Sequence, residues 1–533
     1  MMKRTIALVL TVVLCLSLVG LMAGCKSGKK LNKADKVLGD DVVIDGTDLK
    51  FDSTYTIDMW LPDNTDIEME GCYVDQLLEK TLNINLKVTE YESRDQYETL
   101  IAQQKIPALT LANAKIFGPA YGPLGAYIDW NDYIDQMPNV KKWLKEDGRF
   151  LQDLESYTEE DGSIYQLPLP QTGHADVYGF LYRKDIFDKH NLTFPTSQEE
   201  LMTTLRFLKK EYPNSFPFVQ RGLNGANLSG LTSLANLFDG EYVGFGTYNT
   251  LYRLDDDHKT YYLAQTSDNM RECLQWLHDL YEEELLHPAC LTMDTAQWTE
   301  AFANNTSFVS FDKMDRIQML TMGAIDANPG YVLTGAPGFK MGTNGDGTMD
   351  KLGTGFSFLV SGDLDADNML KILKYVDFLF SDKGIELTNW GEKGVSYEGD
   401  GDARDFKADF TYEGSGLGVA GLFGVKDFDV YCKSQEQHVI DAIKECEKKH
   451  VEENKGFRLT YTDVEQRTFD TYFQKTYDLC QARFQEFIQG KKNPKTDWDA
   501  YVQEITNAVP DAMMKIHNDA LDRYKEKHPE KFQ

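Results

Sequence analysis

Apolar and polar positions between residues 55 and 112 follow a repeating strand–helix–strand order. Short apolar runs, YTIDMWLP at residues 55–62 and INLKV at residues 84–88, predict strands, and segments with helical spacing lie between the runs. Strands that alternate with helices predict a parallel sheet covered by helices. Ligands of such sheets bind beyond the carboxyl ends of the strands. The residues at those ends are candidate site residues: Trp60, Asp63, Asn64 and Asn113.

Two later segments have clear helical periodicity. FPTSQEELMTTLRFLKKEYP begins with a Ser/Thr–Glu capping box at residues 196–200. Its apolar face is formed by Leu201, Leu205 and Leu208. SDNMRECLQWLHDLYEEELL predicts a second helix, with an apolar face formed by Met270, Leu274, Leu277 and Tyr281.

The stretch SIYQLPLPQTGHADVYGFLYRKDIF, residues 163–187, joins two different patterns. Pro168 and Pro170 keep the chain extended, and an aromatic strand starts directly after a polar loop. GYVLTGAPGF, residues 330–339, is a second extended segment that runs into Pro and Gly. Both segments are candidate points where the chain passes from one packed unit to another.

The last hundred residues, from about Tyr431, predict charged helices. Aromatic residues recur there at helical spacing, which usually indicates core packing. We expect this role for Tyr472, Phe473, Tyr477 and Phe484. Trp298 and Trp498 are also expected to be structural.

The first 25 residues have the order of a secretory signal. Lys3 and Arg4 precede an apolar run, residues 6–21, which is shorter than the roughly 20 residues that a membrane-spanning helix needs. Small residues followed by Cys25 resemble a bacterial lipobox, which implies that Cys25 becomes the diacylated first residue of the mature chain. A single lipidated Cys anchors a protein without spanning the membrane. Residues 25–47 are polar and rich in Lys, and predict a flexible tether.

Charge and composition narrow the class of protein. The chain has 55 basic and 85 acidic residues, a net charge of −30, so it is a poor candidate for nucleic-acid binding, which needs basic patches. Hydrophobic residues make up 42% of the chain, enough to build a large core.

Neither the cysteines nor the carboxylates indicate a metal centre. No CxxC or Cys/His cluster has zinc spacing. Beyond the leader and Cys25, the scattered cysteines predict buried free thiols, with disulfide bridges left open: Cys72, Cys273, Cys290, Cys432, Cys446 and Cys480. Asp363, Asp365 and Asp367 resemble the start of a calcium loop but lack its Gly and closing Glu, so we expect Asp367 to cap a helix. No cofactor is expected, and calcium stays possible without support.

No catalytic constellation is present in the sequence. It contains no GxSxG, no HExxH and no Gly-rich phosphate loop ending in GK[ST], and its nine His residues are scattered. Glycosidase chemistry needs only two carboxylates, but no pair is distinguished by its surroundings. The sequence therefore favours a protein that is not an enzyme.

Several motifs resemble those of a known family. The segment DGSIYQLPLPQTGHADVYGFLYRKDIFDKHNLTFPTSQEELMTTLRFLKKEYP resembles the extracellular solute-binding proteins (family 1) of carbohydrate ABC importers. NWGEKGVSYE, residues 389–398, and FIQGKKNPKTDWDAYVQEI resemble the large LipO-like lipoproteins of Gram-positive bacteria. The similarity covers about residues 55–524. The chain departs from the family at AQQKIPAL, residues 102–109, where an acidic residue after the Pro is missing.

This resemblance implies an α/β fold of two lobes, the type II periplasmic-binding-protein-like fold, with extra C-terminal helices. The implied division is a signal peptide at 1–24, the tether at 25–47, and two lobes. Lobe 1 comprises 48–172 and 338–430, and lobe 2 comprises 173–337 and 431–533. Such lobes close on a solute by hinge motion.

A sugar presents hydroxyl groups at its rim and weakly apolar CH faces. A site for it therefore needs aromatic rings and planar polar side chains. The candidate residues are Trp60, Asp63, Asn64, Asn113, Trp130, Gln171, Tyr178, Tyr182, Asp312 and Trp390. Each also has a packing interpretation, which is the stronger one for Trp130 and Tyr182.

The sequence thus predicts a substrate-binding lipoprotein of an ABC importer. It would capture an oligosaccharide in the cleft between the lobes and deliver it to permease subunits. The expected protein is a monomer, held by its lipid on the outer face of the cytoplasmic membrane of a Gram-positive bacterium. Two alternatives stay open: an anchored carbohydrate-active enzyme, and a receptor for peptides or other cationic solutes.

Overall fold

The structure is a computed structural model of the 533-residue chain. It describes residues 33–62, 70–91, 94–112, 117–148, 150–159, 161–173, 177–222, 228–239, 252–254, 260–350, 356–412, 414–418, 424–451, 459, 461–509 and 511–532. Within these ranges, no helix combines the length and the apolar character needed to cross a membrane.

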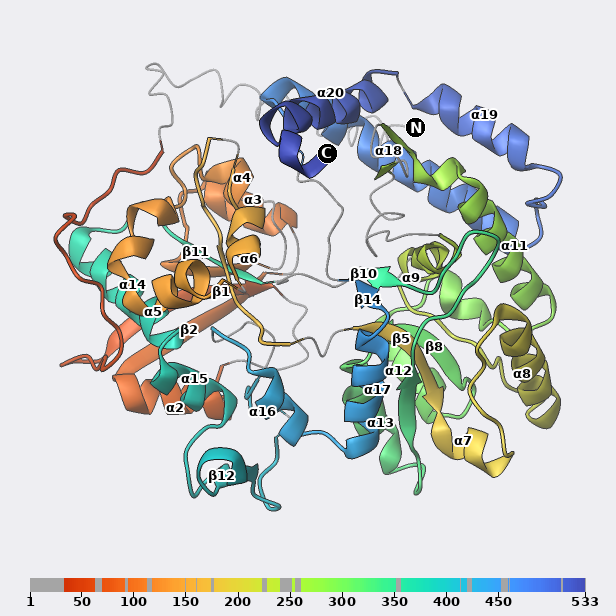
Figure 1. Ribbon diagram of the computed structural model, residues 1–533, viewed down its shortest axis with the longest axis horizontal. Coiled ribbons are helices and arrows are strands. Elements are labelled where there is room, and N and C mark those ends of the chain that lie inside the picture. The colour runs from red at the N-terminus through yellow and green to blue at the C-terminus, as the bar shows by residue number, and fades with distance from the viewer. Residues whose placement is uncertain are drawn as a thin grey trace, which may run out of the picture. The chain divides into compact units, whose positions relative to one another are not determined.

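The chain divides into two compact units, and each is formed by several separate segments (Figure 1). Unit 1 comprises Met1–Leu169, Phe356–Gly384 and Leu422–Gly424. Unit 2 comprises Pro170–Gly355, Ile385–Gly421 and Val425–Gln533. The chain therefore leaves unit 1 between Leu169 and Pro170, inside the Pro-containing stretch of the sequence. The finer lobe boundaries expected from the sequence stay a prediction.

Unit 1 is built on a five-stranded sheet with the strand order β2-β1-β3-β11-β4. The strands are β1 (Tyr55–Pro62), β2 (Ile84–Tyr91), β3 (Leu109–Ala112), β4 (Leu167–Pro168) and β11 (Ser357–Val360). β1 pairs in parallel with β2 and β3, which confirms the parallel sheet predicted for this part of the chain. β11, which belongs to a later segment of the chain, runs antiparallel to β3 and β4.

Helices and short turns surround this sheet. They are α2 (Tyr73–Leu82), α3 (Arg94–Ala102), α4 (Phe117–Tyr121), η1 (Trp130–Asp132), η2 (Ile134–Gln136), α5 (Pro138–Lys141), η3 (Lys142–Glu146), α6 (Leu151–Ser156) and α14 (Ala366–Leu379). α2 and α3 pack against β2, and α14 packs against α5. α15 (Asp382–Asn389) begins in unit 1 and ends in unit 2.

Unit 2 contains a three-stranded antiparallel sheet with the order β8-β5-β9. Its strands are β5 (Tyr178–Arg183), β8 (Val309–Lys313) and β9 (Leu333–Ala336). The shorter pairs are β6 (Tyr252–Leu254) with β7 (Tyr261–Leu263), β10 (Met349–Asp350) with β14 (His450–Val451), and β12 (Tyr397–Glu398) with β13 (Asp405–Phe406).

The helices of unit 2 include a long C-terminal group. Before it come α7 (Lys184–Lys189), α8 (Gln198–Glu211), α9 (Ser229–Ser233), η4 (Leu234–Phe238), η5 (Ala264–Thr266), α11 (Asp268–Glu282), η6 (Pro288–Leu291), α12 (Thr295–Ala303), α13 (Arg316–Ile325), η7 (Gly401–Ala403), α16 (Phe428–Lys433) and α17 (Gln437–Glu447). The group itself is α18 (Asp463–Ile488), α19 (Trp498–Ala508), α20 (Asp511–Lys527) and η8 (Pro529–Phe532). α18 packs against α11, α19 and α20, so the C-terminal helices belong to unit 2 (Figure 1).

The two helices predicted from periodicity are α8 and α11. The Ser197 hydroxyl caps α8 by accepting a hydrogen bond from the Glu200 N–H at 3.3 Å. The predicted apolar residues of α8 are buried, and those of α11 are buried except Tyr281, which is half-buried.

The prediction that Asp367 caps a helix was wrong by two residues. Asp365, not Asp367, caps α14, and its carboxylate accepts the Asn368 N–H at 2.9 Å. Because the helix starts at Ala366, Asp367 lies in its first turn, where it pairs with Lys371.

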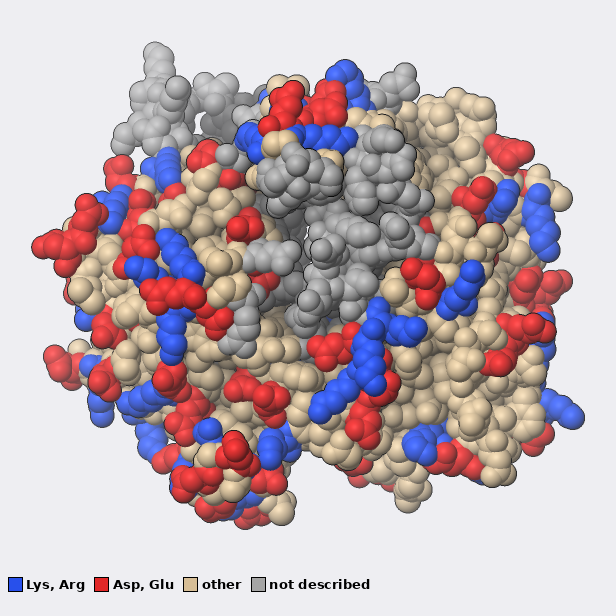
Figure 2. All heavy atoms as spheres, viewed as in Figure 1, with Lys and Arg blue, Asp and Glu red and all other residues tan. Residues whose placement is uncertain are grey.

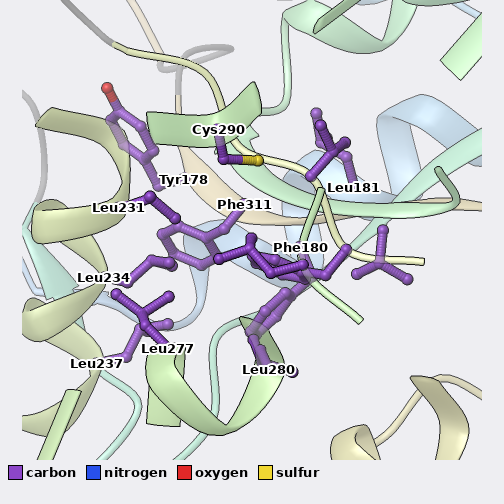
Figure 3. Packing of buried hydrophobic residues seen from close by; sticks show 14 of the residues in the cluster. Tyr178, Phe180, Leu181, Leu231, Leu234, Leu237, Leu277, Leu280, Cys290 and Phe311 are labelled. Atoms are coloured by element: carbon purple, nitrogen blue, oxygen red, sulfur yellow. The ribbon is translucent and has the colours of Figure 1, made fainter. Parts of the chain in front are cut away.

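The core of unit 2 forms around its sheet. Phe180 of β5 packs against Phe311 of β8, with ring centroids 5.0 Å apart. Leu residues from α9, η4 and α11 surround these rings (Figure 3). Tyr178 lies at the edge of the cluster, and its hydroxyl points away from the apolar side chains in Figure 3. The first residue of β5 therefore has a polar atom outside the core.

The six cysteines within the described residues are free thiols. Five are buried and Cys432 is half-buried, which confirms the predicted buried free thiols and resolves the open question of bridges. Burial raises the pKa of the Cys290 and Cys446 thiols to about 12, because the thiolate is disfavoured in an apolar environment.

We expect Cys432 to be the first of these six thiols to react with a thiol reagent such as a maleimide in the native protein. The other five should react only after denaturation, since both access and thiolate formation are suppressed by burial. Mass spectrometry of the labelled peptides measures both stages. Fewer than six labelled thiols in the denatured, unreduced chain would reveal a disulfide and contradict the structure.

Candidate functional site

Polar side chains gather where β5 begins and β8 ends. These strands are antiparallel neighbours, with Tyr178 opposite Lys313 and Gly179 opposite Asp312. The Lys313 ammonium lies 5.9 Å from the centre of the Tyr178 ring. The register therefore brings two of the predicted site residues, Tyr178 and Asp312, to the same edge of the unit 2 sheet.

Asp312 is fully buried and forms an ion pair with Arg221. The two side chains meet in a fork: Arg221 Nε donates to Asp312 Oδ2 at 2.8 Å, and Nη2 donates to Oδ1 at 3.1 Å. Two parallel hydrogen bonds fix the guanidinium plane as well as its position. Burial by itself would lower the pKa of Arg221, but the Asp312 carboxylate outweighs burial and raises it. Arg221 is therefore a fixed cation.

Two further residues, Thr295 and Trp298, contact the Arg221 guanidinium. Its Nη1 donates to the Thr295 hydroxyl at 3.0 Å, and the guanidinium lies 5.1 Å from the ring of Trp298. Trp298 is fully buried, and its Nε1 donates to the Ser310 hydroxyl at 3.0 Å. These contacts confirm a structural role for Trp298 and explain why Arg221 is rigidly held.

A guanidinium carries five N–H donors. In Arg221, three of them bond Asp312 and Thr295. Among the described residues, the remaining two N–H groups, one on each terminal nitrogen, have no partner, and the side chain keeps 11% of its surface exposed. The ion pair with Asp312 thus holds these two N–H donors of Arg221 in a fixed position at the partly exposed end of the side chain.

The neighbouring Gln220 ties this edge to the sheet. Its amide nitrogen donates to the Phe311 carbonyl at 2.7 Å, and its amide oxygen accepts the Phe311 N–H at 3.1 Å and the Ser310 hydroxyl at 3.0 Å. These partners of the Gln220 side chain lie on β8, so the backbone that carries Arg221 is fixed to the strand that carries Asp312.

Sequence reasoning missed Arg221. It follows the short apolar run FPFVQ, whose Phe218 bridges in parallel to Val309 of β8. The run therefore behaves as a strand with a charged residue at its end, and this position was the available signal. Its partner Asp312 lies 91 positions later, which local pattern could not reveal.

Gln171 lies in a short paired segment next to the unit boundary. It bridges in parallel to Lys426: the Lys426 N–H donates to the Pro170 carbonyl at 2.9 Å, and the Thr172 N–H donates to the Lys426 carbonyl at 3.0 Å. Asn389 holds the same segment through the Val425 carbonyl and the Asp427 N–H, at 2.9 and 2.8 Å. Gln171 is buried, and its backbone has a structural role here.

Trp390 directly follows Asn389 and lies in a small aromatic cluster of its own. Its ring centroid is 5.3 Å from that of Tyr397 and 5.0 Å from that of Phe406, and the Arg404 guanidinium lies 5.1 Å from the ring. The side chain is 7% exposed. Packing accounts for its described surroundings.

The aromatic candidates of unit 1 are also packed. Trp60 of β1 is 9% exposed and meets Tyr97 edge-on, with centroids 5.5 Å apart. Trp130 is fully buried and presents no surface to a solute in this structure. Tyr182 of unit 2 packs between Phe187 and Phe194, at 4.8 and 4.6 Å.

Three predicted site residues, Asp63, Asn64 and Asn113, lie outside the described residues. Within unit 2, the structure therefore brings Tyr178 and Asp312 together, whereas Gln171, Tyr182 and Trp390 have the other surroundings described above. Over the described part of the chain, no group of three or more His, Cys, Asp or Glu side chains is arranged to hold a metal ion.

A comparison with known protein families identifies the family of this chain. The sequence profile of the family described as bacterial extracellular solute-binding protein matches residues 73–386, more than half of the chain. The chain belongs to this family. It is therefore a binding protein of an extracellular solute-binding family and not an enzyme, and the resemblance noted in the sequence is confirmed. Its place in the LipO-like subgroup stays a prediction.

Several solved structures are similar to this solute-binding protein over nearly its whole length. The alginate-binding protein AlgQ2, in its structure without calcium ion, is 19% identical with a TM-score of 0.71, and the match covers 91% of this chain and 100% of that chain. An HMO-binding, ABC-transporter-associated solute-binding protein from Bifidobacterium longum infantis is 20% identical with a TM-score of 0.67, covering 89% and 99%. The substrate-binding protein FusA of S. pneumoniae, in complex with kestose, is 17% identical with a TM-score of 0.66, covering 89% and 100%.

At these identities the likeness concerns the fold, and it confirms the predicted two-lobe α/β fold class with its C-terminal helices. No curated protein matches the chain at a significant level.

The burial of Asp312 leads to a stability prediction. Arg221→Met would leave the Asp312 carboxylate buried without its cation, so we expect a loss of about 3–5 kcal/mol in the free energy of unfolding. Urea denaturation followed by circular dichroism measures this loss.

Arg206→Met is the matched control. Arg206 forms the same kind of fork with Glu283, at 2.5 and 2.6 Å, but this pair is exposed. Its removal should change the free energy of unfolding by no more than about 1 kcal/mol. Equal losses in the two variants would show that burial of Asp312 has no special weight.

Proposed function

We propose that this protein is the substrate-binding lipoprotein of an ABC importer, and that its solute is a carbohydrate, most simply an oligosaccharide. The observation that carries the proposal is the match of the whole fold to proteins named for carbohydrates. These names are alginate-binding for AlgQ2, HMO-binding for the Bifidobacterium protein, and the kestose complex for FusA. The bound sugar would be delivered unchanged to permease subunits in the membrane.

The edge formed by Arg221 and Tyr178 supports this proposal on chemical grounds. Sugar hydroxyls are recognised by fixed, planar hydrogen-bonding groups. The two N–H groups that Arg221 does not spend on Asp312 and Thr295 are such donors, and the Tyr178 hydroxyl points away from the apolar core (Figure 3). Because Asp312 already holds the guanidinium in place, the Arg221 side chain loses little conformational entropy when a sugar binds.

The location proposed for the protein rests on its first 25 residues. Cationic, apolar and small-residue segments precede Cys25 in the order of a lipoprotein signal. The mature protein would be a monomer, held by its lipid on the outer face of the cytoplasmic membrane of a Gram-positive bacterium. Residues 1–32 lie outside the described residues, so this part of the proposal depends on sequence.

A glycan panel tests the function. We expect at least one oligosaccharide to raise the melting temperature and to bind in calorimetry, with no product detectable by chromatography. Arg221→Lys keeps the charge but loses the fork. Losing one hydrogen bond from a charged group should weaken binding roughly 10- to 100-fold. Arg206→Lys, at the exposed fork, should bind as the unsubstituted protein does.

Other outcomes would select another function. Turnover of a glycan would indicate a carbohydrate-active enzyme. Stabilisation by peptides or polyamines, with none by any sugar, would indicate a receptor for cationic solutes.

A further inference from the structure

The segment just after the expected anchor is not free of the folded protein. Residues 33–50, which we call the N-terminal clamp, run along unit 1 and bond to it at several points. Lys33 pairs with the buried carboxylate of Asp129, and its ammonium also donates to the Ser163 hydroxyl at 3.2 Å. The Val37 N–H donates to the Tyr133 hydroxyl at 3.1 Å. These partners all belong to unit 1.

The middle of the clamp is held by the side chain and backbone of Gln136. The amide nitrogen of Gln136 donates to the carbonyls of Gly39 and Val42, both at 2.7 Å. The Gln136 carbonyl accepts the Ile44 N–H at 2.8 Å. Leu38 and Ile44 are buried, so apolar packing supports these hydrogen bonds.

The far end of the clamp is fixed by Asp377, a fully buried residue of α14. Its Oδ2 accepts the Gly46 N–H at 2.9 Å and the Asn139 side-chain amide at 2.7 Å. Its Oδ1 accepts the backbone N–H groups of Asn139 and Val140, at 3.0 and 3.1 Å. Burial raises the pKa of Asp377, and these four donors oppose that rise. A buried carboxyl group needs such partners, so the clamp, α5 and α14 are bound together at one point.

Gly46 makes this close approach possible. A Cβ atom at this position would lie 2.3 Å from the Lys374 carbonyl oxygen and 2.4 Å from the Phe378 backbone nitrogen. Both atoms belong to the backbone of α14, which cannot give way as a flexible side chain could. Any larger residue at position 46 would therefore push the clamp off α14.

We infer that the clamp joins the lipid anchor to unit 1 and holds the Lys33 edge of that unit close to the membrane. This inference rests on the proposed lipidation of Cys25. Eight residues, 25–32, separate the anchor from Lys33, and they span at most about 29 Å. Without the clamp, the first fixed point would be Phe51, whose N–H bonds the Leu82 carbonyl at 2.9 Å. The 26 residues 25–50 could then span up to about 94 Å.

The edge of unit 1 around Lys33, Asp129 and Ser163 would accordingly stay within about 29 Å of the anchor. Lys26, Lys29 and Lys30 lie in the connecting segment and would meet the anionic headgroups of the outer leaflet. A short connection also keeps the receptor at high effective concentration near membrane partners. The clamp thus sets the distance from which a bound solute is delivered.

Energy transfer in proteoliposomes tests the inference on the full lipidated chain. A donor dye is placed at the exposed position of Asn131→Cys, in a Cys432→Ser background, and an acceptor is placed on lipid headgroups. We expect efficient transfer in the clamped protein. Gly46→Val combined with Lys33→Ala and Gln136→Ala, which also removes side-chain contacts nearer the anchor, should lower the transfer efficiency about twofold or more, because release of the clamp lengthens the maximal connection about threefold.

Gly148→Val is the matched control, because a Cβ atom at Gly148 of unit 1 meets nothing within 4 Å. It should leave the transfer efficiency unchanged. A second variant adds sixteen Gly and Ser residues after Lys30, which lengthens the connection by about 55 Å and leaves the clamp intact. It should lower transfer even if the combined variant does not fold.

Hydrogen exchange and lipid analysis separate the possible failures. Rapid exchange of the Val37, Ile44 and Gly46 amides in the unsubstituted protein would overturn the clamp. Transfer that is the same in the unsubstituted and the lengthened protein, or absence of lipid on Cys25, would overturn the membrane-proximal placement. Sugar binding by the same samples reports on the proposed function independently, since neither variant alters Arg221 or Tyr178.

Discussion

The buried ion pair between Arg221 and Asp312 is the constraint on which the candidate site depends. A carboxylate that is fully buried at the end of β8 must have a cation, and Arg221 supplies it through two hydrogen bonds of 2.8 and 3.1 Å. The same fork fixes the guanidinium over Trp298 and beside Thr295. Two donors then remain at the surface of unit 2. An interaction that the fold needs for stability therefore also preorganises the two donors that we propose for sugar recognition.

Unit 1 satisfies a buried carboxylate in a different way. Among the described residues, Asp377 forms no ion pair, and it is held by four N–H donors from the clamp, Asn139 and Val140. Asp312 thus fixes a charged group at a surface, whereas Asp377 fixes three segments of backbone and side chain to one another. Both residues show that in a chain with a net charge of −30 the informative acids are the few that are buried. On the surface shown in Figure 2, acidic and basic side chains are interspersed, and exposed pairs of this kind contribute little to stability.

The sequence pattern predicted helices and strands well, but it predicted the surroundings of individual side chains less well. The parallel pairing of β1 with β2 and β3 and the buried faces of α8 and α11 follow from local periodicity. Trp60, Trp130 and Trp390 were candidates because they stand at or near the ends of elements, but the same positions also suit packing, and aromatic neighbours bury Trp60 and Trp390. Local pattern cannot distinguish these two outcomes.

The contacts that build the candidate site and the clamp join residues far apart in sequence, and for this reason the sequence pattern did not predict them. Arg221 meets Asp312 across 91 positions, Lys33 meets Asp129 across 96, and Gly46 meets Asp377 across 331. The polar, Lys-rich composition of residues 25–47 predicts a tether, and nothing local in that segment reveals that its later part bonds to distant residues. Family membership came from motifs that occur in order, and the profile match over residues 73–386 confirms it.

The most direct test of the central claim is the nitrogen-15 NMR signal of the Arg221 Nε–H group, recorded as an oligosaccharide that binds the protein is added. The signal can be assigned with Arg221→Lys. The account predicts a slowly exchanging Nε–H proton in the free protein, because of its bond to Asp312, and a chemical-shift change on saturation while the exposed Arg206 signal stays in place. A bound sugar that leaves the Arg221 signal unmoved, or a fast-exchanging Nε–H in the free protein, would contradict the account.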